Sequence, residues 1–404
     1  MRRVVITGIG VISPCGNSVD EVYQSLITGF SGIVPSEVQN ANFLAQVNNE
    51  CLNKLSKKEK RYLDRTAQFA LLASREAVVD SDLNFEELDS NRVGISFGTS
   101  MGGYGTLREE IINSKLQGLD SLNVLGMPKS LHNLIGTNIS MEFNCKGGVF
   151  TYNTACASSS IAIGEGYRKI QAGDLDVVIA GGSESCIYDE VLESFNKLGA
   201  LSKSEKLEEA SIPFATKRSG FVLGEGSAIL ILEDYEHALS RNAHIYCEIN
   251  GYSVTSDAKS LVAPDFEGIS LCLDKAIKRA KLLPSDIEYI NAHGTSTEAN
   301  DRIESKAIQT IFKDSVEKPF VSSTKSLHGH LLGAAGALEA LICCLIIDNE
   351  VIFPQINMSE SDVDKDVDLN LLLEKVVPYR GGSIMSNSFA FGGANSTLIF
   401  SKLK

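Results

Sequence analysis

The sequence lacks a long hydrophobic run, a signal peptide and an excess of basic residues. The longest apolar stretch, residues 336–347, is too short to span a bilayer and contains Glu339. The residues after Met1 lead straight into a strand-like run with no small-residue cleavage site, so we expect a cytoplasmic protein without a membrane partner. With 37 lysines and arginines against 51 acidic residues, and a formal net charge of −14, the chain is also not expected to bind nucleic acid.

A disulfide framework is also absent. The nine cysteines are odd in number, scattered over 404 residues and include no C-x-x-C pair, which predicts reduced thiols that mostly pack as small core residues. Tryptophan is missing altogether. The chain is nevertheless 43% hydrophobic and 22% charged, which is ordinary for a globular protein with a sizeable core and excludes disorder and collagen-like repeats.

Short apolar runs bounded by glycine alternate with helix-like segments along the whole chain. Such runs predict buried strands with helices over both faces, and therefore an α/β fold. Helical periodicity is clear over residues 61–79. The expected strands are residues 4–9, 92–97, 175–180, 229–232, 245–249, 287–291 and 320–323.

Two segments far apart in the chain are similar. Residues 174–182 and 285–294 both contain an acidic helix exit, then a buried strand, then a glycine turn. This similarity predicts a duplicated α/β unit, with an N-terminal half of residues 1–244 and a C-terminal half of residues 245–404. No linker rich in proline, glycine or serine separates the halves, so we expect them to pack as one body.

The first motif with chemical content is G-G-V-F-T-Y-N-T-A-C-A-S-S-S, residues 147–160. A β-rich run leads into Cys156, and small hydroxyl residues then open a helix. At such a turn, free backbone N–H groups and the helix dipole favour a thiolate, which would make Cys156 a nucleophile. A buried cysteine followed by a serine N-cap is the better explanation of this segment when it is taken alone.

Two further motifs place histidines at strand ends. In N-A-H-G-T-S-T, residues 291–297, His293 follows a buried strand, which is where α/β proteins bind ligands. A histidine that bonds only its own loop is the alternative. In S-S-T-K-S-L-H-G-H, residues 322–330, a strand runs into a loop that contains Lys325 and two histidines, the second being His330.

Glu339 is the only charged residue between His330 and Asp348, in a segment that otherwise has a fully buried pattern. A buried carboxylate needs a partner. The candidates are Lys325 and a histidine of the same motif.

The pair His328-x-His330 raises the alternative of a metal site. Cys156, His293 or Glu339 would complete it. The spacing matches no common zinc signature, and H-E-x-x-H is absent, so no metal is expected.

The fourth motif, M-S-N-S-F-A-F-G-G-A-N at residues 385–395, predicts a hairpin with a glycine turn that presents phenylalanines. Backbone N–H groups in such a turn can form an oxyanion hole, although phenylalanines at alternate positions are more often core. With the cysteine, the two histidines and the lysine–glutamate pair, the turn completes an inventory for acyl transfer on a thiol. A cysteine protease needs only one histidine, whereas two neutral imidazoles that donate to one oxygen suit an enolate.

These four motifs, in this order, resemble the β-ketoacyl-acyl carrier protein synthases, the elongating condensing enzymes of the thiolase superfamily. The similarity extends from residues 4–10 through 220–226 to 387–389, and its specific signals are N-A-H-G-T-S-T and T-K-S-x-x-G-H-x-x-G-A-A-G. The resemblance implies a thiolase-like fold, in which two pseudo-repeated α/β halves form a five-layered αβαβα body. The branch most similar in pattern is the type II synthase that elongates longer acyl chains in bacterial fatty acid synthesis.

The resemblance implies that Cys156 takes an acyl chain as a thioester. His293 and His330 would bind the malonyl thioester and stabilise the enolate formed on loss of carbon dioxide, and the carbanion would then attack the acyl group in a Claisen condensation. Lys325, paired with Glu339, would set the electrostatics. No metal or organic cofactor is implied, because both substrates are carried on the phosphopantetheine of an acyl carrier protein.

The resemblance also implies the surroundings of the nucleophile. Backbone N–H groups of Cys156 and Phe391 would form the oxyanion hole, and Phe391 would act as a gate that swings when the acyl chain arrives. The residues expected to bind phosphopantetheine or the acyl chain are Thr295, Thr297, Phe389, Phe391, Met101 and Phe195.

Three positions depart from the family pattern. Ala390 replaces the usual glycine before the gate, which predicts a stiffer hinge because it removes the freedom of glycine to adopt positive φ. His328 stands where a small or apolar residue is common, and residues 215–222 lose both acids of the usual D-x-x-R-D-G-F-V. These departures keep a second pathway open, in which the chain is the catalytic ketosynthase of a type II polyketide or polyene pathway.

The resemblance implies an acyl carrier protein and a second subunit as partners. The subunit would form a homodimer, or a heterodimer with a chain-length-factor-like protein. A non-catalytic partner of the same fold is the competing interpretation, which the intact Cys156, His293 and His330 disfavour. A coenzyme A thiolase would carry a second cysteine near the C-terminus, and none follows Cys344. Carrier docking needs basic residues; the run K-K-E-K-R at residues 57–61 is basic, but such runs are more often solvated helix faces.

Overall fold

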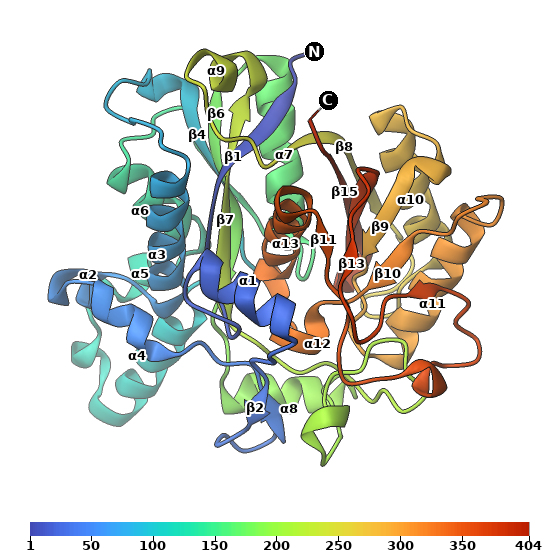
Figure 1. Ribbon diagram of the computed structural model, residues 1–404. Coiled ribbons are helices and arrows are strands. Elements are labelled where there is room, and N and C mark those ends of the chain that lie inside the picture. Colours follow the sequence, from blue (N-terminus) through green and yellow to red (C-terminus); the bar gives the residue numbers. More distant parts are fainter. Residues whose placement is uncertain (404) are drawn as a thin grey trace.

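Figure 1 shows the computed structural model, which describes residues 1–403. Eleven strands are hydrogen-bonded in the order β12-β10-β9-β14-β15-β8-β1-β7-β6-β4-β5, and residues 4–6 of β1 pair with residues 247–249 of β8. The first half of the chain supplies β1 (Val4–Ile12), β4 (Val93–Gly98), β5 (Val149–Tyr152), β6 (Val177–Glu184) and β7 (Gly226–Asp234). The second half supplies β8 (Cys247–Ser256), β9 (Ile287–Asn291), β10 (Phe320–Ser322), β12 (Asn370–Leu371), β14 (Ser383–Phe389) and β15 (Ala394–Ser401). Two short pairs lie outside this sheet, β2 (Val34–Pro35) with β3 (Phe43–Leu44) and β11 (Val351–Ile352) with β13 (Val377–Pro378).

Both halves of the sheet have the same pairing pattern. In the first half β5, β4 and β6 are parallel neighbours, and β7 and β1 follow antiparallel. In the second half β10, β9 and β14 are parallel neighbours, and β15 and β8 follow antiparallel. The predicted duplication is therefore confirmed, whereas the boundary between the two halves at residue 244 stays a prediction.

The two segments that suggested the duplication are not equivalent. Residues 174–182 contain most of β6 and residues 285–294 contain β9, but the pairing pattern matches β6 with β14 and β9 with β4. The assignment of these two segments to each other was wrong. A buried strand that runs into glycine recurs within such a fold, so this feature alone does not identify its counterpart.

The helices form three layers around the two halves of the sheet (Figure 1). In the centre, α7 (Ser158–Ala172) and α13 (Ala335–Asn349) pack against each other, α7 on β6 and β4, and α13 on β7 and β14. The outer layers are α3 (Arg65–Asp80) with α6 (His132–Glu142), and α10 (Phe266–Ala280) with α11 (Glu298–Ile311). The five-layered αβαβα order is therefore confirmed. The remaining helices are α1 (Val19–Thr28), α2 (Lys57–Tyr62), α4 (Tyr104–Gln117), α5 (Gly126–Ser130), α8 (Asp189–Lys197), α9 (Tyr235–Ser240) and α12 (Lys325–His328).

Helix α3 shows how local chemistry sets an element boundary. The predicted helix over residues 61–79 begins at Arg65, because Asp64 is its N-cap and accepts a hydrogen bond of 2.9 Å from the Thr66 N–H. Phe69, Ala70 and Ala73 on its apolar face are buried, and the helix packs on β1 and β7.

Helix α13 is the buried centre of the molecule. Within residues 1–403, one helical stretch, Leu332–Asn349, is long and apolar enough to cross a membrane, and 89% of it is buried inside the protein. The sequence argument that this segment is too short to span a bilayer was therefore insufficient, because the helix begins before residue 336. Its burial identifies it as a core helix.

Candidate active site

One cavity of about 630 Å³ lies where several strands end. β5 leads to Cys156, β9 to His293, β10 to the loop with His330, and β14 ends at Phe389. Lys325 and Glu339 lie behind the wall of the cavity and are fully buried. The predicted site residues that line the cavity are Cys156, His293, His330, Thr295, Thr297, Phe389, Phe391, Met101 and Phe195.

Cys156 and the two histidines form a compact triad. His330 Nε2 lies 3.1 Å from Cys156 Sγ, and the rings of His293 and His330 meet edge to face with centroids 5.4 Å apart. Cys156 Sγ and one ring nitrogen of each histidine lie within 4.8 Å of one another. Residues from both halves of the chain are thus brought to one sulfur atom.

The turn before α7 aims the cysteine. Ala155 adopts φ = +48°, a left-handed conformation that is unusual for a residue with a Cβ, and α7 begins three residues later. The N-cap is Ala157, so the alternative of a serine N-cap after Cys156 is wrong. Ser158 instead accepts from the Thr154 N–H at 2.9 Å and ties the turn together.

The expectation that this position favours a thiolate is wrong for the resting site. Burial raises the pKa of Cys156 to about 12, although the Lys325 charge and the backbone N–H groups of Phe391 and Cys156 oppose the rise. The cysteine is therefore a thiol at neutral pH, and it needs a base. His330 Nε2 is within reach of its proton.

This raised pKa predicts the pH dependence of alkylation. The rate of iodoacetamide modification at Cys156 should rise about tenfold per pH unit through pH 10, because the thiolate fraction keeps rising below a pKa of about 12. The measurement is the mass of the peptide that contains Cys156 after timed exposure. A rate that levels off near neutral pH would show a stable thiolate and contradict this account.

Both histidines are neutral. Burial, and then the nearby Lys325 ammonium, lowers the pKa of His293 and of His330 well below the ordinary value. Nδ1 of each ring has no hydrogen-bond partner among the described residues, so no bond there fixes the tautomer. Each Nε2 is therefore free to accept a proton or to donate one.

Lys325 is the partner of Glu339. Its Nζ bonds Glu339 Oε1 and also donates to the His293 carbonyl oxygen at 2.6 Å. Burial raises the pKa of Glu339 to about 7, and the Lys325 charge opposes the rise. The lysine thus links a buried carboxylate to the backbone of a site histidine.

Glu304 on α11 is a site residue that the sequence analysis missed. Its carboxylate accepts from the N–H groups of His293 and Gly294, each at 2.8 Å, and is completely buried. Burial raises its pKa to about 7. The sequence does indicate that Glu304 is buried, because Asp301, Glu304 and Ile308 recur at the spacing of one buried helix face.

The gate is a tight turn between β14 and β15. Phe389 packs edge to face on His293 with ring centroids 5.9 Å apart, while Phe391 is partly exposed at the cavity. Gly392 and Gly393 adopt φ of +83° and +75°, whereas Ala390 is extended at φ = −114°. The argument for a stiffer hinge at Ala390 therefore does not apply to this conformation, because the left-handed positions keep their glycines.

The remaining predicted residues divide between the two sides of the cavity. Thr295 and Thr297 are linked by a 2.8 Å hydrogen bond between their hydroxyl groups, and both line the cavity. Met101 and Phe195 lie on the apolar side with Cys156. The cavity thus has hydroxyl groups for a polar arm and an apolar wall for a chain.

The triad does not fit a metal site. A metal-bound histidine normally donates its second ring N–H to an acceptor, and Nδ1 of both histidines lacks a partner in the described part of the chain. The positive charge of Lys325 also acts on both rings. His328 is bonded to Gly329 and Thr324 rather than turned to the triad, so the alternative built on His328-x-His330 is wrong.

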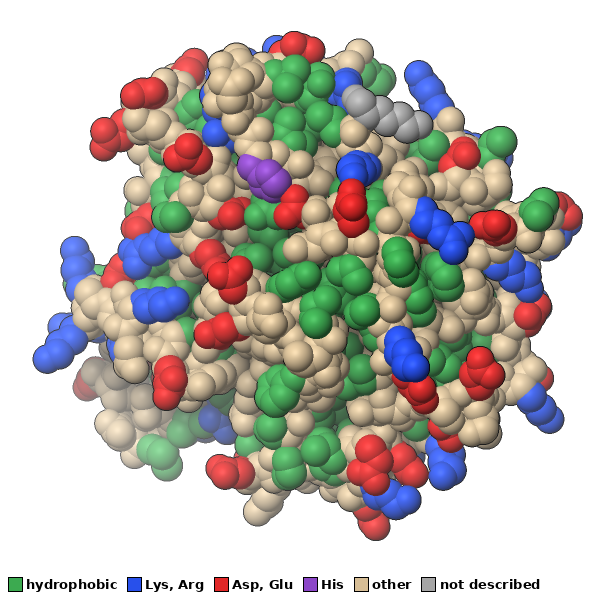
Figure 2. Space-filling view, in the orientation of Figure 1, with side chains coloured by type: hydrophobic (Ala, Val, Ile, Leu, Met, Phe, Trp, Pro, Cys, Tyr) green, Lys and Arg blue, Asp and Glu red, His purple; other side chains and the backbone are tan. Residues whose placement is uncertain are grey.

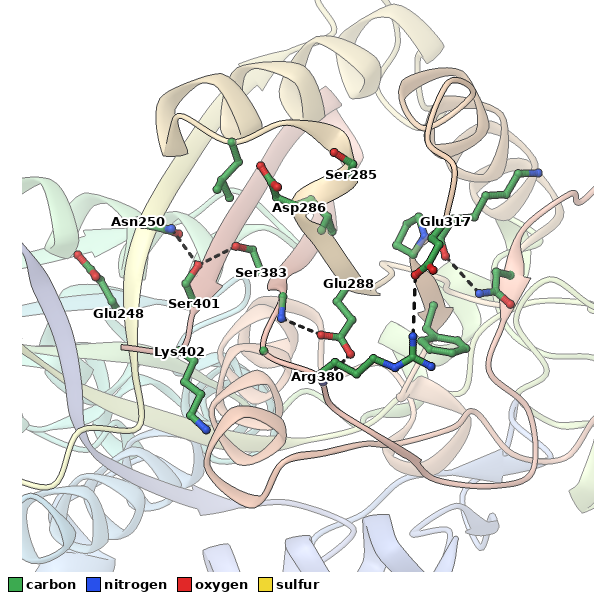
Figure 3. A pocket seen from close by; sticks show the side chains of 18 of the residues that line it. Glu248, Asn250, Ser285, Asp286, Glu288, Glu317, Arg380, Ser383, Ser401 and Lys402 are labelled. Atoms are coloured by element: carbon green, nitrogen blue, oxygen red, sulfur yellow. Dashed lines mark hydrogen bonds and ion pairs between the residues drawn. The ribbon is translucent and has the colours of Figure 1, made fainter. Parts of the chain in front are cut away.

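A second cavity, of about 840 Å³, lies where β9, β10 and β14 begin (Figure 3). Several of its charged groups already have partners: Arg3 pairs with Glu248, Arg380 with Glu317, and Glu288 accepts backbone N–H groups. Over the residues that the structure describes, no cysteine or histidine lines it. The smaller cavity is therefore the candidate active site.

A thiolase-like fold with a cysteine at the start of a central helix and two neutral histidines at its sulfur defines a condensing enzyme that holds its acyl group on a thiol. The chain belongs to the beta-ketoacyl synthase family. The N-terminal domain of that family matches residues 1–238, and its C-terminal domain matches residues 246–359. The protein is accordingly a ketosynthase, an acyltransferase of the 3-oxoacyl-ACP synthase type.

Relatives match over their full length. A 3-oxoacyl-[acyl-carrier-protein] synthase 2 of Coxiella burnetii (strain RSA 493 / Nine Mile phase I) is 38% identical over 411 residues, covering 100% of this chain and 99% of the relative. The same enzyme of Staphylococcus aureus (strain COL) is 37% identical over 417 residues with the same coverage.

Solved structures of ketosynthases have the same fold as this chain. A beta-ketoacyl synthase from Burkholderia phymatum STM815 has a TM-score of 0.91 at 32% identity, with 100% of both chains covered. A chain from a type II PKS acyl-carrier protein in complex with its ketosynthase bound to the hexaketide has a TM-score of 0.92 at 32% identity, again over 100% of both chains.

Proposed function

We propose that this protein condenses malonyl-ACP, with loss of carbon dioxide, with an acyl chain held as a thioester on Cys156, and that it does so in fatty acid elongation in the cytoplasm. The observation that carries the proposal is the 3.1 Å approach of His330 Nε2 to Cys156 Sγ, with His293 beside them in a cavity that has an apolar side. Lys325, behind the wall, supplies fixed positive charge.

The first half-reaction loads the cysteine. His330 Nε2 accepts the Cys156 proton, and Sγ attacks the thioester carbonyl of the acyl carrier. The oxyanion forms against the N–H groups of Cys156 and Phe391, the same groups that oppose the rise in the thiol pKa. The C–S bond to the carrier then breaks, and its thiolate leaves with the proton held by His330.

The second half-reaction makes the new carbon–carbon bond. After loading, His330 loses its Nδ1 proton to solvent and takes one on Nε2, a change of tautomer that no bond at Nδ1 opposes. The Nε2–H groups of His293 and His330 then donate to the malonyl thioester oxygen, so that carbon dioxide can leave and the electron pair is held as an enolate. The carbanion attacks the acyl carbonyl on Cys156, and the C–S bond breaks. The Cys156 thiolate takes a proton from solvent, the one proton that the decarboxylative condensation consumes, and the product leaves on the carrier with two more carbons.

The experiment that tests the proposal combines the protein with an acyl-loaded and a malonyl-loaded carrier protein. The expected product on the carrier is a 3-oxoacyl chain two carbons longer than the starting acyl group, seen by mass spectrometry together with carbon dioxide release. Hydrolysis of the acyl carrier without chain extension would contradict it.

A second candidate is the catalytic ketosynthase of a type II polyketide or polyene pathway. Solved neighbours at 31–32% identity include a type II PKS ketosynthase complex and the ishigamide ketosynthase/chain length factor, which supports this candidate. The distinguishing result is repeated extension without reduction of each keto group, and a requirement for a chain-length-factor subunit.

We propose that the second subunit covers an apolar surface around α4. β5 is the last strand in the sheet order, so one of its edges is unpaired in the described chain and is available to a second subunit.

If the second subunit is another copy of this chain, the purified protein should have twice the 43.6 kDa mass of one chain by light scattering. A monomer that dimerises only with a sister subunit would favour the heterodimer. The exposed apolar residues of this surface are Leu107, Ile111, Ile112, Leu116, Leu119, Leu122, Val124, Met127 and Leu131.

The docking site of the acidic carrier protein stays a prediction. On the face in Figure 2, most basic side chains are interspersed with acidic ones, but several lie close together at the left, where Figure 1 places α2. The basic residues of α2 (Lys57, Lys58, Lys60 and Arg61) are all exposed on a short helix, which supports α2 as the candidate docking segment.

A further inference from the structure

His328 is a buried histidine that the proposed mechanism does not use. It ends α12, is 1% exposed and does not line the cavity. Its Nδ1 lies 2.8 Å from the Gly329 carbonyl oxygen, and its Nε2 lies 3.0 Å from Thr324 Oγ1. Because a carbonyl oxygen can only accept, Nδ1 carries the proton, and Nε2 accepts from the Thr324 hydroxyl. A neutral ring therefore satisfies both contacts.

The first contact orients the peptide that joins Gly329 to His330. Gly329 adopts φ = +67°, and a Cβ there would lie 2.8 Å from the Ala45 side chain and 2.9 Å from the Val222 carbonyl oxygen. The position must therefore be glycine, which restricts its own backbone least. The N–H of this peptide donates to the Val222 carbonyl oxygen at 2.7 Å, and the hydrogen bond from His328 holds its carbonyl oxygen, so both ends of the peptide before the base are fixed.

The second contact reaches the other site groups. Thr324 immediately precedes Lys325, and its Oγ1 accepts from Asn291 Nδ2 at 3.4 Å. Asn291 ends β9, two residues before His293. One imidazole is thus bonded to the segments before His330 and Lys325, and through Thr324 to the strand that leads to His293.

We propose that His328 is a positioning residue that holds His330, Lys325 and His293 in register for the decarboxylation step. This inference rests on the proposed function. Burial lowers the pKa of His328 to about 3, which keeps the ring neutral with one donor and one acceptor. A small or apolar side chain at this position cannot make both bonds. Two bonded segments would then lose a fixed orientation, and misplacement of site groups by about 1 Å can cost about 100-fold in rate.

The test uses malonyl decarboxylation by a Cys156→Gln protein, because this reaction needs no acyl loading. His328→Leu should lower its kcat about tenfold while KM changes less than about twofold. His328→Asn keeps a donor near Nδ1 and His328→Gln keeps an acceptor near Nε2, so both should fall between His328→Leu and the parent. These two variants also decide the question if His328→Leu does not fold.

Ser326→Ala is the matched control. Ser326 lies on the same short helix, is buried and makes two hydrogen bonds, to the Ser323 carbonyl and from the Ile356 N–H, but contacts neither Thr324 Oγ1 nor the Gly329 carbonyl. It should lower the melting temperature without lowering kcat. If all three His328 variants lose no more kcat per folded protein than Ser326→Ala, the positioning role is overturned. If the Cys156→Gln parent itself releases no carbon dioxide, the proposed function has failed instead.

Discussion

Cys156→Ala should abolish condensation, with a loss of at least about 1,000-fold, because no other cysteine lines the cavity among residues 1–403. Cys156→Gln should likewise fail to condense, yet it should still release carbon dioxide from malonyl carrier protein. His293, His330 and Lys325 remain in place in that variant, and they form the part of the site assigned to the enolate. The measurement compares product formation with carbon dioxide release in the same samples.

The control for this prediction is another buried cysteine. Cys145 packs in the core on the far side of the first half of the sheet and does not line the cavity. Cys145→Ala should therefore condense within about twofold of the parent, since one lost core thiol mainly costs stability. Retained elongation by Cys156→Ala would contradict the entire account of the nucleophile.

Lys325→Met should lose most decarboxylation activity and also destabilise the fold by about 3–5 kcal/mol, because it leaves the buried Glu339 carboxylate unpaired. The same change removes the donor to the His293 carbonyl. Denaturant unfolding measures the first effect, and carbon dioxide release measures the second.

The double variant Lys325→Met, Glu339→Leu separates the two effects. Replacing both members of a buried ion pair with apolar groups is often nearly neutral for stability, so unfolding should return toward the parent value. Decarboxylation should stay low, because the positive charge and the donor to His293 are still missing. Recovery of decarboxylation in the double variant would show that Lys325 acts only as a structural partner of Glu339.

The sequence predicted the parts of the fold that local patterns encode. Apolar β-branched runs bounded by glycine identified β1, β4 and β9 closely, and helical periodicity identified α3. Cys156, His293 and the loop with Lys325 and His330 were found because each follows a strand, which is where α/β proteins bind ligands. The roles of these residues, and the choice of Met101, Phe195, Thr295 and Thr297, came from the resemblance to the β-ketoacyl-acyl carrier protein synthases.

The features that the sequence did not predict depend on contacts between segments that are far apart in the chain. The wrong match between residues 174–182 and 285–294 arose because the pairing partners of a strand are not written in its own sequence. The pKa of Cys156 depends on complete burial, which outweighs the backbone N–H groups that the local motif reveals. Glu304 was missed because its role, accepting two N–H groups of the His293 loop, exists only once α11 lies against the loop that follows β9.

The most direct test of the central claim is the mass of the peptide that contains Cys156. After exposure to acyl-loaded carrier protein, this peptide should gain the mass of one acyl group, while the other eight cysteines stay unmodified. Addition of malonyl-loaded carrier protein should remove the acyl mass and produce a 3-oxoacyl carrier in equal amount. An unmodified Cys156 in a protein that still elongates the chain would contradict the account.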